Sequence, residues 1–466
     1  MVLLAFLCFL ALAVTVAFLD WRRGVVFMLV CAPLQDVVRK LTPGNPVVLT
    51  MSIVAIYFMI IFTARRVLKQ ELVDFSRRFG GVYRAALLVM VFVVLAAFTG
   101  IVTFGLGLWK VPALSLFIYT APIPAIVLGY AYAQREEQIA TFFRFYAIIT
   151  AVALIGTPLE FWKVQWNALG MVGLPQGFIR HLPGLQIRLL SGFYRAPDIM
   201  GWHAAMLTII GITLALRGRV IRAMWPWALL AGWGFFNCIL SGRRKAVYMV
   251  AAFALVFVWR YIRRLTVAQA IAFALVGMTM LLVVNNLSSK EESNVYTRGT
   301  ITSRAEVIER LEGGVVETVE QFGFMGAGLG TATQGVRHLL GTDQNVGWQE
   351  AGLGKLTIEL GVPGLIAVAF AFFVMMRALL LMSGYPDEEG SSQLMRCALF
   401  GIFAACVANF LASAQAYSDA GLTIVTAFLL GNLLATAALH DRLTRREAEP
   451  AQVAGVGQLV AAAAAN

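Results

Sequence analysis

Long apolar runs, separated mostly by short polar stretches, extend from Met1 to about residue 440. A helix needs about 20 apolar residues to cross the hydrocarbon core of a bilayer, and most of these runs approach that length. The pattern predicts an all-α, polytopic transmembrane helical bundle with about 12–14 spans. The predicted spans are 2–19, 24–38, 46–63, 85–104, 111–132, 141–158, 199–216, 224–241, 245–259, 266–285, 359–382, 396–412 and 420–439.

The second predicted span, 24–38, is the weakest, because Pro33, Gln35 and Asp36 interrupt it. A transmembrane β-barrel would instead show alternating segments of about ten residues, and the sequence has no such segments. The first run begins at Met1 without a basic region before it or an obvious cleavage site after it, so we expect it to be retained as a helix.

Three interhelical segments are long, 64–84, 159–198 and 286–358, and the last two are expected on the outer side of the membrane. Residues 1–285 form the first ten predicted spans, including an outer loop at 159–198 that is aromatic and apolar and is expected to lie among lipid headgroups. The large extracytoplasmic loop, 286–358, contains an apolar stripe with helical spacing and is therefore expected to be helical in part. Spans within 359–439 and a cytoplasmic tail at 440–466 complete the chain.

Composition agrees with a membrane protein. The 466 residues are 60% hydrophobic and only 13% charged, too apolar for a soluble chain of this length. The net charge is +12, from 37 Lys and Arg against 25 Asp and Glu. In a soluble domain this excess would suggest nucleic acid, but in a membrane protein it serves as a topology signal, so we expect no nucleic-acid partner.

The distribution of charge predicts the orientation. If DWRRG, residues 20–24, is cytoplasmic and the chain alternates from there, most of the 37 cations lie inside and most of the 25 acids lie outside. SGRRK, residues 241–245, is then an exception, because three adjacent cations face outward. Snorkelling to lipid headgroups could explain this block, but we favour at least one cation facing the bundle.

The predicted outer side carries arginines in segments punctuated by glycine and proline. They are Arg188 and Arg195 before the seventh predicted span, Arg243 and Arg244 in the SGRRK block, and Arg304 in the large loop. The planar guanidinium group suits bidentate contacts with phosphate oxygens. Several arginines at a membrane surface therefore predict a lipid diphosphate as ligand.

Three further features could carry chemistry. Glu350 could serve as a general base beside a bound diphosphate, or it could stabilise the helix that follows it. His338 is the alternative base, whereas His203 is expected to be packed within its helix. The GxGxG run in GFMGAGLGTATQG, 323–335, lacks the flanking strand of a dinucleotide site; a surface turn is the first expectation and a loop that closes over a ligand the second.

Four blocks, in this order, resemble the bacterial superfamily of O-antigen ligases and O-antigen polymerases, which are integral membrane glycosyltransferases. The blocks are RLLSGFYRAPDIMGWH (188–203), LSGRRKAVYMVAAF (240–253), SRAEVIERLEG with FGFMGAGLGT (303–331), and ELGVPGLIAVAF (359–370). The resemblance covers about residues 180–380. Asp198 stands where the family usually has Asn.

The resemblance implies an enzyme of the bacterial cytoplasmic membrane with an outward-facing site. Its donor would be a glycan on undecaprenyl diphosphate and its acceptor another glycan, lipid or protein, with a chain-length regulator and a flippase as further partners. Arginines of the first two blocks would hold the diphosphate, and no metal or other cofactor would be needed.

One position departs from the ligase pattern. The family's ligases carry a histidine eleven residues before the glycine that matches Gly361, and this chain has Glu350 there. We therefore expect a polymerase of exopolysaccharide or O-antigen repeat units. A ligase is the alternative within the class, and a lipid-linked glycan transporter or flippase is the alternative from another class.

Overall fold

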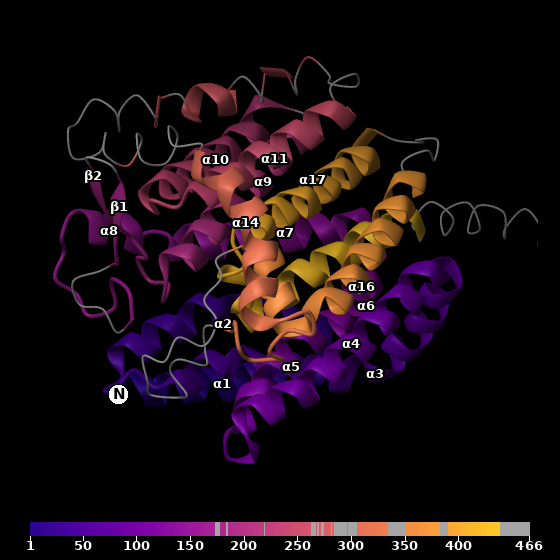
Figure 1. Ribbon diagram of the computed structural model, residues 1–466. Helices are drawn as coiled ribbons and strands as arrows, with labels where there is room; N and C mark the ends of the chain where they lie inside the picture. Colours follow the sequence, from indigo (N-terminus) through magenta and orange to yellow (C-terminus); the bar gives the residue numbers. More distant parts are fainter. Residues whose placement is uncertain are drawn as a thin grey trace, which may run out of the picture.

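The computed structural model describes residues 1–172, 178–182, 185–218, 220–261, 305–333, 351–382 and 390–438. Between 262 and 304 it describes residues 267, 270–271, 275–280, 282–283 and 296. Long helices lie side by side and make up almost all of this part of the chain (Figure 1). Ten of the described helices or helix pairs are long and apolar enough to cross a membrane. A multi-pass helical membrane protein is therefore confirmed.

These ten candidates correspond to ten of the thirteen predicted spans. The predicted span 24–38 is a helix, α2 (Trp21–Leu41), and 245–259 is α11 (Arg244–Tyr261), but neither is among the ten. Residues 266–285 are described only in part, at 267, 270–271, 275–280 and 282–283, where they are helical. The predicted number of spans stays a prediction.

The first 132 residues form one group of helices, in the lower part of Figure 1. It consists of α1 (Val2–Leu19), α2, η1 (Val47–Met51), α3 (Ser52–Arg78), α4 (Gly80–Phe104), η2 (Leu106–Leu108), α5 (Lys110–Thr120) and α6 (Pro122–Tyr132). The helices α1, α2 and α3 pack against one another, and α4 packs against α16 (Gly352–Met382) from the C-terminal part.

The second group is built around one buried helix. It consists of α7 (Glu136–Ala153), α8 (Gly156–Phe161), α9 (Pro197–Arg217), α10 (Ile221–Leu240), α11, α17 (Gly390–Ala412), η4 (Ala416–Ser418) and a last helix, Ala420–Ala438. Almost every side chain of α9 is buried, because α7, α10, α11 and α17 all pack against it. A helix that is apolar all round is typical of such a central position.

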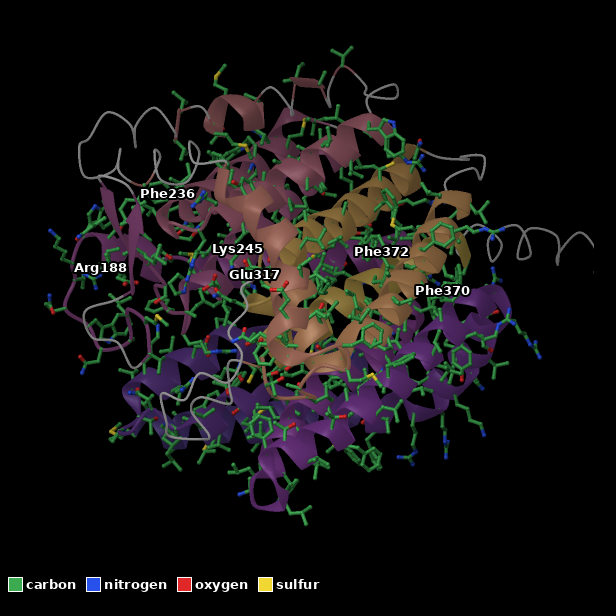
Figure 2. The ribbon with its side chains drawn as sticks, in the orientation of Figure 1. Arg188, Phe236, Lys245, Glu317, Phe370 and Phe372 are labelled. Atoms are coloured by element: carbon green, nitrogen blue, oxygen red, sulfur yellow. The ribbon has the colours of Figure 1, made fainter. Side chains whose placement is uncertain are left out.

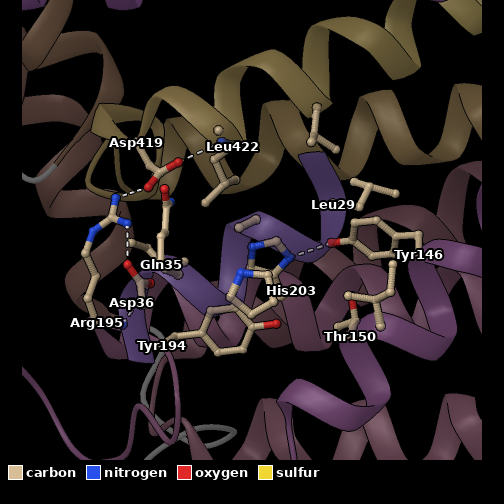
Figure 3. A pocket seen from close by; sticks show the side chains of 16 residues that line it. Leu29, Gln35, Asp36, Tyr146, Thr150, Tyr194, Arg195, His203, Asp419 and Leu422 are labelled. Atoms are coloured by element: carbon tan, nitrogen blue, oxygen red, sulfur yellow. Dashed lines mark hydrogen bonds and ion pairs between the residues drawn. The ribbon is translucent and has the colours of Figure 1, made fainter. Parts of the chain in front are cut away.

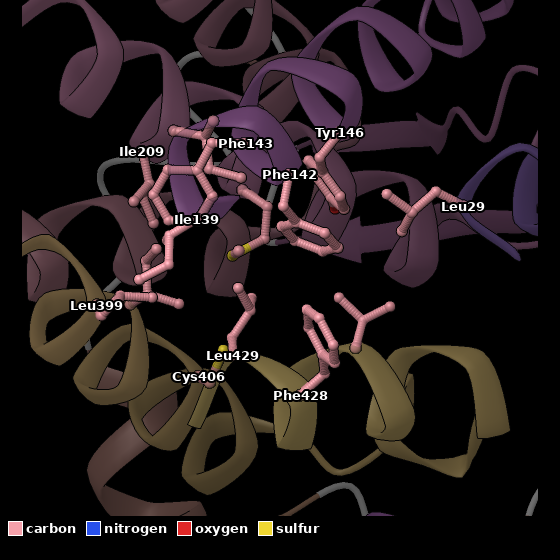
Figure 4. Close-up of a cluster of buried hydrophobic side chains, with 14 of the residues drawn as sticks. Leu29, Ile139, Phe142, Phe143, Tyr146, Ile209, Leu399, Cys406, Phe428 and Leu429 are labelled. Atoms are coloured by element: carbon pink, nitrogen blue, oxygen red, sulfur yellow. The ribbon is translucent and has the colours of Figure 1, made fainter. Parts of the chain in front are cut away.

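The core where these helices meet is rich in aromatic side chains. Phe142 of α7 lies between Tyr146 of the same helix and Phe428 of the last helix, with ring centroids 6.3 Å and 5.0 Å away (Figure 4). Rings at this separation stabilise the contact beyond the area that they bury. The core therefore joins segments far apart in the sequence.

The expectation of an all-α chain needs one correction. Within the predicted outer loop 159–198, β1 (Phe178–Leu182) and β2 (Leu185–Leu189) pair antiparallel as a hairpin, in register from Phe178 opposite Leu189 to Leu182 opposite Leu185. Along β2, exposed and buried side chains alternate: Gln186 and Arg188 are exposed, and Ile187 and Leu189 are buried. This is the two-residue period of a half-buried strand. The hairpin and α8 lie together at one end of the bundle, at the left of Figure 1.

The large loop was predicted to contain a helix, and α14 (Ala305–Phe322) confirms this for the described residues. The predicted span 359–382 lies within α16, which begins at Gly352 and is broken at Gly361, where φ is 70° and ψ is 178°. Pro363 lies just after this break and lacks the N–H that would continue the helix.

Candidate functional site

The irregular turn before α9 is fixed by one buried carboxylate. Glu160 of α8 is 4% exposed, and its Oε2 accepts hydrogen bonds from the backbone N–H groups of Ser191 (2.9 Å) and Gly192 (2.7 Å). Gly192 has a φ of +55°, and a Cβ there would lie 2.6 Å from the Thr157 nitrogen. A glycine is therefore required where the turn approaches α8.

Arg188 lies on β2 beside this turn. Its side chain is 43% exposed, and a guanidinium nitrogen lies 3.8 Å from Glu160 Oε1. In Figure 2 Arg188 lies at the end of the molecule that carries the hairpin. Of the predicted diphosphate ligands that the structure describes, Arg188 is the most exposed to solvent.

Lys40 joins the end of α2 to the same turn. Its amine donates to the carbonyl oxygens of Gly192 (2.8 Å) and Tyr194 (2.6 Å). Burial lowers the pKa of Lys40 to about 8, and the nearby carboxylates of Asp36 and Glu160 oppose this shift. Sequence reasoning missed both Lys40 and Glu160. Glu160 could have been noticed as an isolated acid at the end of an apolar run.

The structure has an open cavity of about 800 Å³. It is lined by Lys40, Lys163 and Arg188, together with Asn45, Glu160 and residues 164–167 and 169–172. Its walls are partly polar and partly apolar. A site of this size falls in the range of about 300–1,000 Å³ that is usual for small ligands. The cavity offers three cations against one carboxylate, so its chemistry suits an anionic ligand.

Arg195 has a different environment. One guanidinium nitrogen lies 3.0 Å from Asp36 of α2, and another forms an ion pair with Asp419. The backbone N–H of Arg195 also donates to Asp36, at 3.1 Å. Arg195 thus links α2, the turn before α9 and the start of the last helix; its binding of a diphosphate stays a prediction.

The cations of the basic block 241–245 are largely buried, and two of them form ion pairs within the protein. Arg243 lies 2.9 Å from a carboxylate oxygen of Asp198, and Lys245 forms an ion pair with the other oxygen. Arg244, the first residue of α11, and Lys245 are each 7% exposed. Snorkelling to lipid headgroups is therefore the wrong explanation for Lys245, whose partner lies inside the bundle (Figure 2).

A polar segment between α17 and the last helix connects these clusters, and sequence reasoning did not single it out. Ser413 accepts from Lys245 (2.9 Å), and the Gln415 amide lies 3.1 Å from both carboxylate oxygens of Asp198. Ser418 accepts from Lys355 of α16 (3.1 Å), and Asp419 pairs with Arg195. The signal available in the sequence was the polar run SAQAYSD between two apolar runs.

The glycine-rich run 323–333 is not the predicted surface turn. Leu329 is fully buried, its N–H donates to Ala96 of α4 (2.9 Å), and Ala327 donates to Ile358 of α16 (2.8 Å). A Cβ at Gly328 would lie 2.2 Å from the Gly100 nitrogen, so the backbones of the two segments touch. The glycines therefore serve close packing.

Glu359 anchors this run from the middle of α16. It is fully buried, and its carboxylate accepts hydrogen bonds from Tyr119 (2.7 Å), Thr333 (2.7 Å) and the Gly330 N–H (3.3 Å). Buried carboxylates need such donors, because an unpaired charge in the interior is costly. The Glu359 of the fourth resemblance block is thus engaged in holding the fold.

His203 is packed, as expected. It is 8% exposed, its Nδ1 is hydrogen-bonded to the Tyr146 hydroxyl (2.7 Å), and its ring stacks on Tyr194 at 4.9 Å between centroids (Figure 3). The cavity beside it measures about 20 Å³, room for one water molecule. A substrate does not fit there.

Three predicted residues, Arg304, His338 and Glu350, lie outside the described residues, and so does the predicted tail 440–466. Within the described ranges, no group of three His, Cys, Asp or Glu side chains could hold a metal ion.

No protein-family model matches the chain, and no curated protein is similar to it.

Proposed function

We propose that this protein transfers a glycan from undecaprenyl diphosphate to an acceptor sugar on the outer side of a bacterial cytoplasmic membrane. The product is an exopolysaccharide or O-antigen chain, lengthened by repeat units. The observation that carries the proposal is the cavity at one end of the bundle, where Arg188 is half-exposed beside Lys40 and Lys163. A lipid diphosphate is an anion held at a membrane surface, and this cavity offers it cations.

In this proposal Arg188 donates hydrogen bonds to the diphosphate and stabilises the negative charge that develops as the glycan leaves. Arg244, buried at the start of α11, does not line this cavity and stays a predicted ligand of the diphosphate. Arg243 and Arg195 contribute less, because Asp198, Asp36 and Asp419 already balance their charge. Glu350 remains the proposed general base, with His338 as the alternative.

Arg188→Ala should abolish polymer formation and leave the amount of folded protein in the membrane unchanged. The control is Arg23→Ala, because the Arg23 side chain is 79% exposed and lies outside the cavity. Arg244→Ala is expected to abolish polymer too, and its folding is checked by its unfolding temperature. Full activity of Arg188→Ala would contradict the diphosphate role.

Deleting the gene in its native bacterium and sizing the glycan left on the lipid carrier tests the whole proposal. Accumulation of single repeat units indicates a polymerase. Accumulation of complete chains on the carrier indicates the ligase alternative, with an acceptor other than a growing chain.

A transporter is the second candidate, because α16 is broken at Gly361 next to the buried ionisable residues Lys355 and Glu359. Broken helices and intramembrane charges are common in transporters. In that case the deletion would leave lipid-linked units on the cytoplasmic side and remove glycan from the outer side.

A further inference from the structure

The cavity beside Arg188 has more room and more kinds of side chain than a diphosphate requires. Its volume is about 800 Å³, and most of the residues that line it belong to the segment 163–172 rather than to α2 or β2. The inference drawn here rests on the proposed function and concerns what occupies this remaining space.

Glu160 presents an unused hydrogen-bond acceptor. Its Oε2 is satisfied by two backbone N–H groups, but its Oε1 is buried and has no hydrogen-bond partner. The nearest cation, Arg188, is 3.8 Å away, too far for a hydrogen bond. A buried carboxylate oxygen without a donor is costly, and because Glu160 lines the open cavity, a ligand hydroxyl that reaches this oxygen would satisfy it.

The chain leaves α8 through a strained residue that brings Lys163 to the cavity. Lys163 has a φ of +59°. Its N–H donates to the backbone carbonyl of Glu160 (3.0 Å), and the N–H of Val164 donates to the backbone carbonyl of Leu159 (3.0 Å). These bonds define a helix C-terminal motif in which glycine is the usual residue at the left-handed position. A lysine there is unfavourable for the backbone, and such strain is typical of functional sites.

The segment after Lys163 carries side chains that suit a sugar. The indole of Trp166 is 48% exposed and is held edge-on against Phe193, with ring centroids 5.3 Å apart. Gln165 and Asn167 flank it, and Asn45 lines the cavity from the chain after α2. An aromatic plane offers contact area at low entropic cost, and amides can both donate to and accept from hydroxyl groups.

We propose that this cavity is a glycan subsite: it holds the sugars next to the diphosphate, with Glu160 Oε1 accepting a hydrogen bond from a sugar hydroxyl and Trp166 lying against the sugar. Glu160 then acts in specificity as well as in holding the turn. Lys40 and Lys163 face the same space and favour a glycan that carries an acidic group next to its carrier diphosphate.

Native mass spectrometry of the purified protein in detergent tests the subsite. The probes are plain undecaprenyl diphosphate and the undecaprenyl-diphosphate-linked glycan extracted from the deletion strain, offered together in equal amounts. The wild-type protein should prefer the glycan-bearing lipid. The preference should fall about tenfold in Glu160→Gln, which keeps an acceptor for the turn but loses the charge of Oε1.

Trp166→Ala should also lower the preference, whereas the matched control Trp162→Ala should not, because Trp162 is 68% exposed and does not line the cavity. Arg188→Ala should weaken the binding of both lipids equally, because both carry the diphosphate. Trp166 lies at the surface, so this variant remains informative if Glu160→Gln fails to fold.

Three results separate the possible failures. An unchanged preference in both Glu160→Gln and Trp166→Ala overturns the subsite while leaving the proposed function intact. Displacement of the glycan-bearing lipid by phosphatidylglycerol, with the variants unchanged, assigns the cavity to a lipid headgroup and also overturns it. Binding of neither probe by the wild-type protein contradicts the proposed function itself.

Discussion

At the scale of single residues, the arginines predicted to bind an anion differ in what already balances their charge. Arg195 faces two carboxylates, Arg243 shares Asp198 with Lys245, and Arg188 has one carboxylate at 3.8 Å and an open cavity. A guanidinium that already has carboxylate partners must exchange them for a ligand, at a cost in desolvation and reorganisation. Arg188 faces the smallest cost of this kind.

Arg195 is therefore expected to contribute to stability. Arg195→Met should lower the free energy of unfolding by about 3–5 kcal/mol, because it removes the guanidinium that pairs with both buried carboxylates, Asp36 and Asp419. Unfolding in mixed detergent micelles measures the loss. The control, Arg23→Met, removes an exposed ion pair and should leave stability unchanged. Equal stability of wild type and Arg195→Met would show that this cluster is not structural.

Lys40 predicts a dependence of stability on pH. Its pKa is about 8 in the folded protein and about 10.5 in the unfolded chain, because burial disfavours its charge. Between these values the unfolded state binds more protons, so this group makes the protein more stable as the pH rises from about 8 to 10.5. The neutral amine can still donate to Gly192 and Tyr194.

The free energy of unfolding, measured across this pH range, should rise in the wild-type protein but not in Lys40→Met. The difference between the two stability profiles therefore gives the contribution of Lys40. A difference that stays constant with pH would contradict the shifted pKa.

At the scale of elements, the glycine-rich run was predicted to be a surface turn, but in the structure it is a closely packed segment. Glycine suggested backbone freedom at a surface. The structure uses it for close approach: 326–330 lies against α4, α5 and α16, and Glu359 holds the run in place. The sequence could not distinguish these roles, because both require residues without a Cβ.

Gly328→Ala should destabilise the protein by about 2–4 kcal/mol, because φ there is +90° and the new Cβ would meet the backbone of Gly100. The measurement is again unfolding in mixed micelles. Gly107→Ala is the matched control, since no atom lies within 4 Å of the position that its Cβ would take. If the two variants were equally stable, the contact between this run and α4 would not be tight.

At the scale of the whole molecule, the ends of the bundle differ in content. One end gathers the hairpin, α8, the basic block 241–245 and the polar segment 413–419. The other contains the distal part of α3, where Asp74 accepts from Tyr130 (2.6 Å), and the ion pairs of Arg217 with Glu136 and Glu137. The distribution of charge predicts that the first end faces outward.

Cysteine labelling of intact cells tests this orientation in a variant without the five native cysteines. A membrane-impermeant maleimide should label Gln165→Cys, at the hairpin end, without permeabilisation. It should label Lys69→Cys, an exposed site in the distal half of α3, only after permeabilisation. The reverse pattern would place the cavity in the cytoplasm and contradict an outward-facing site.

The sequence by itself determined the class of fold and most of the helices. An apolar run of membrane length predicts a membrane-spanning helix without knowledge of its neighbours, because hydrophobicity is a local property of a segment. Ten predicted spans follow from this rule, and α14 follows from the helical spacing of an apolar stripe, which is also a local pattern. The sequence also marked the arginine blocks, because their glycines, prolines and charges stand out locally.

Only the tertiary structure decided which of those cations are already paired and where a ligand has room. Arg195 meets Asp36 across 159 positions and Asp419 across 224, and the cavity combines Lys40, Glu160 and Arg188 from three separate segments. Charges interact through space, so the availability of a side chain depends on neighbours that no local pattern identifies. For the same reason Glu160 attracted no notice in the sequence, although its unused oxygen now gives the cavity its most specific feature.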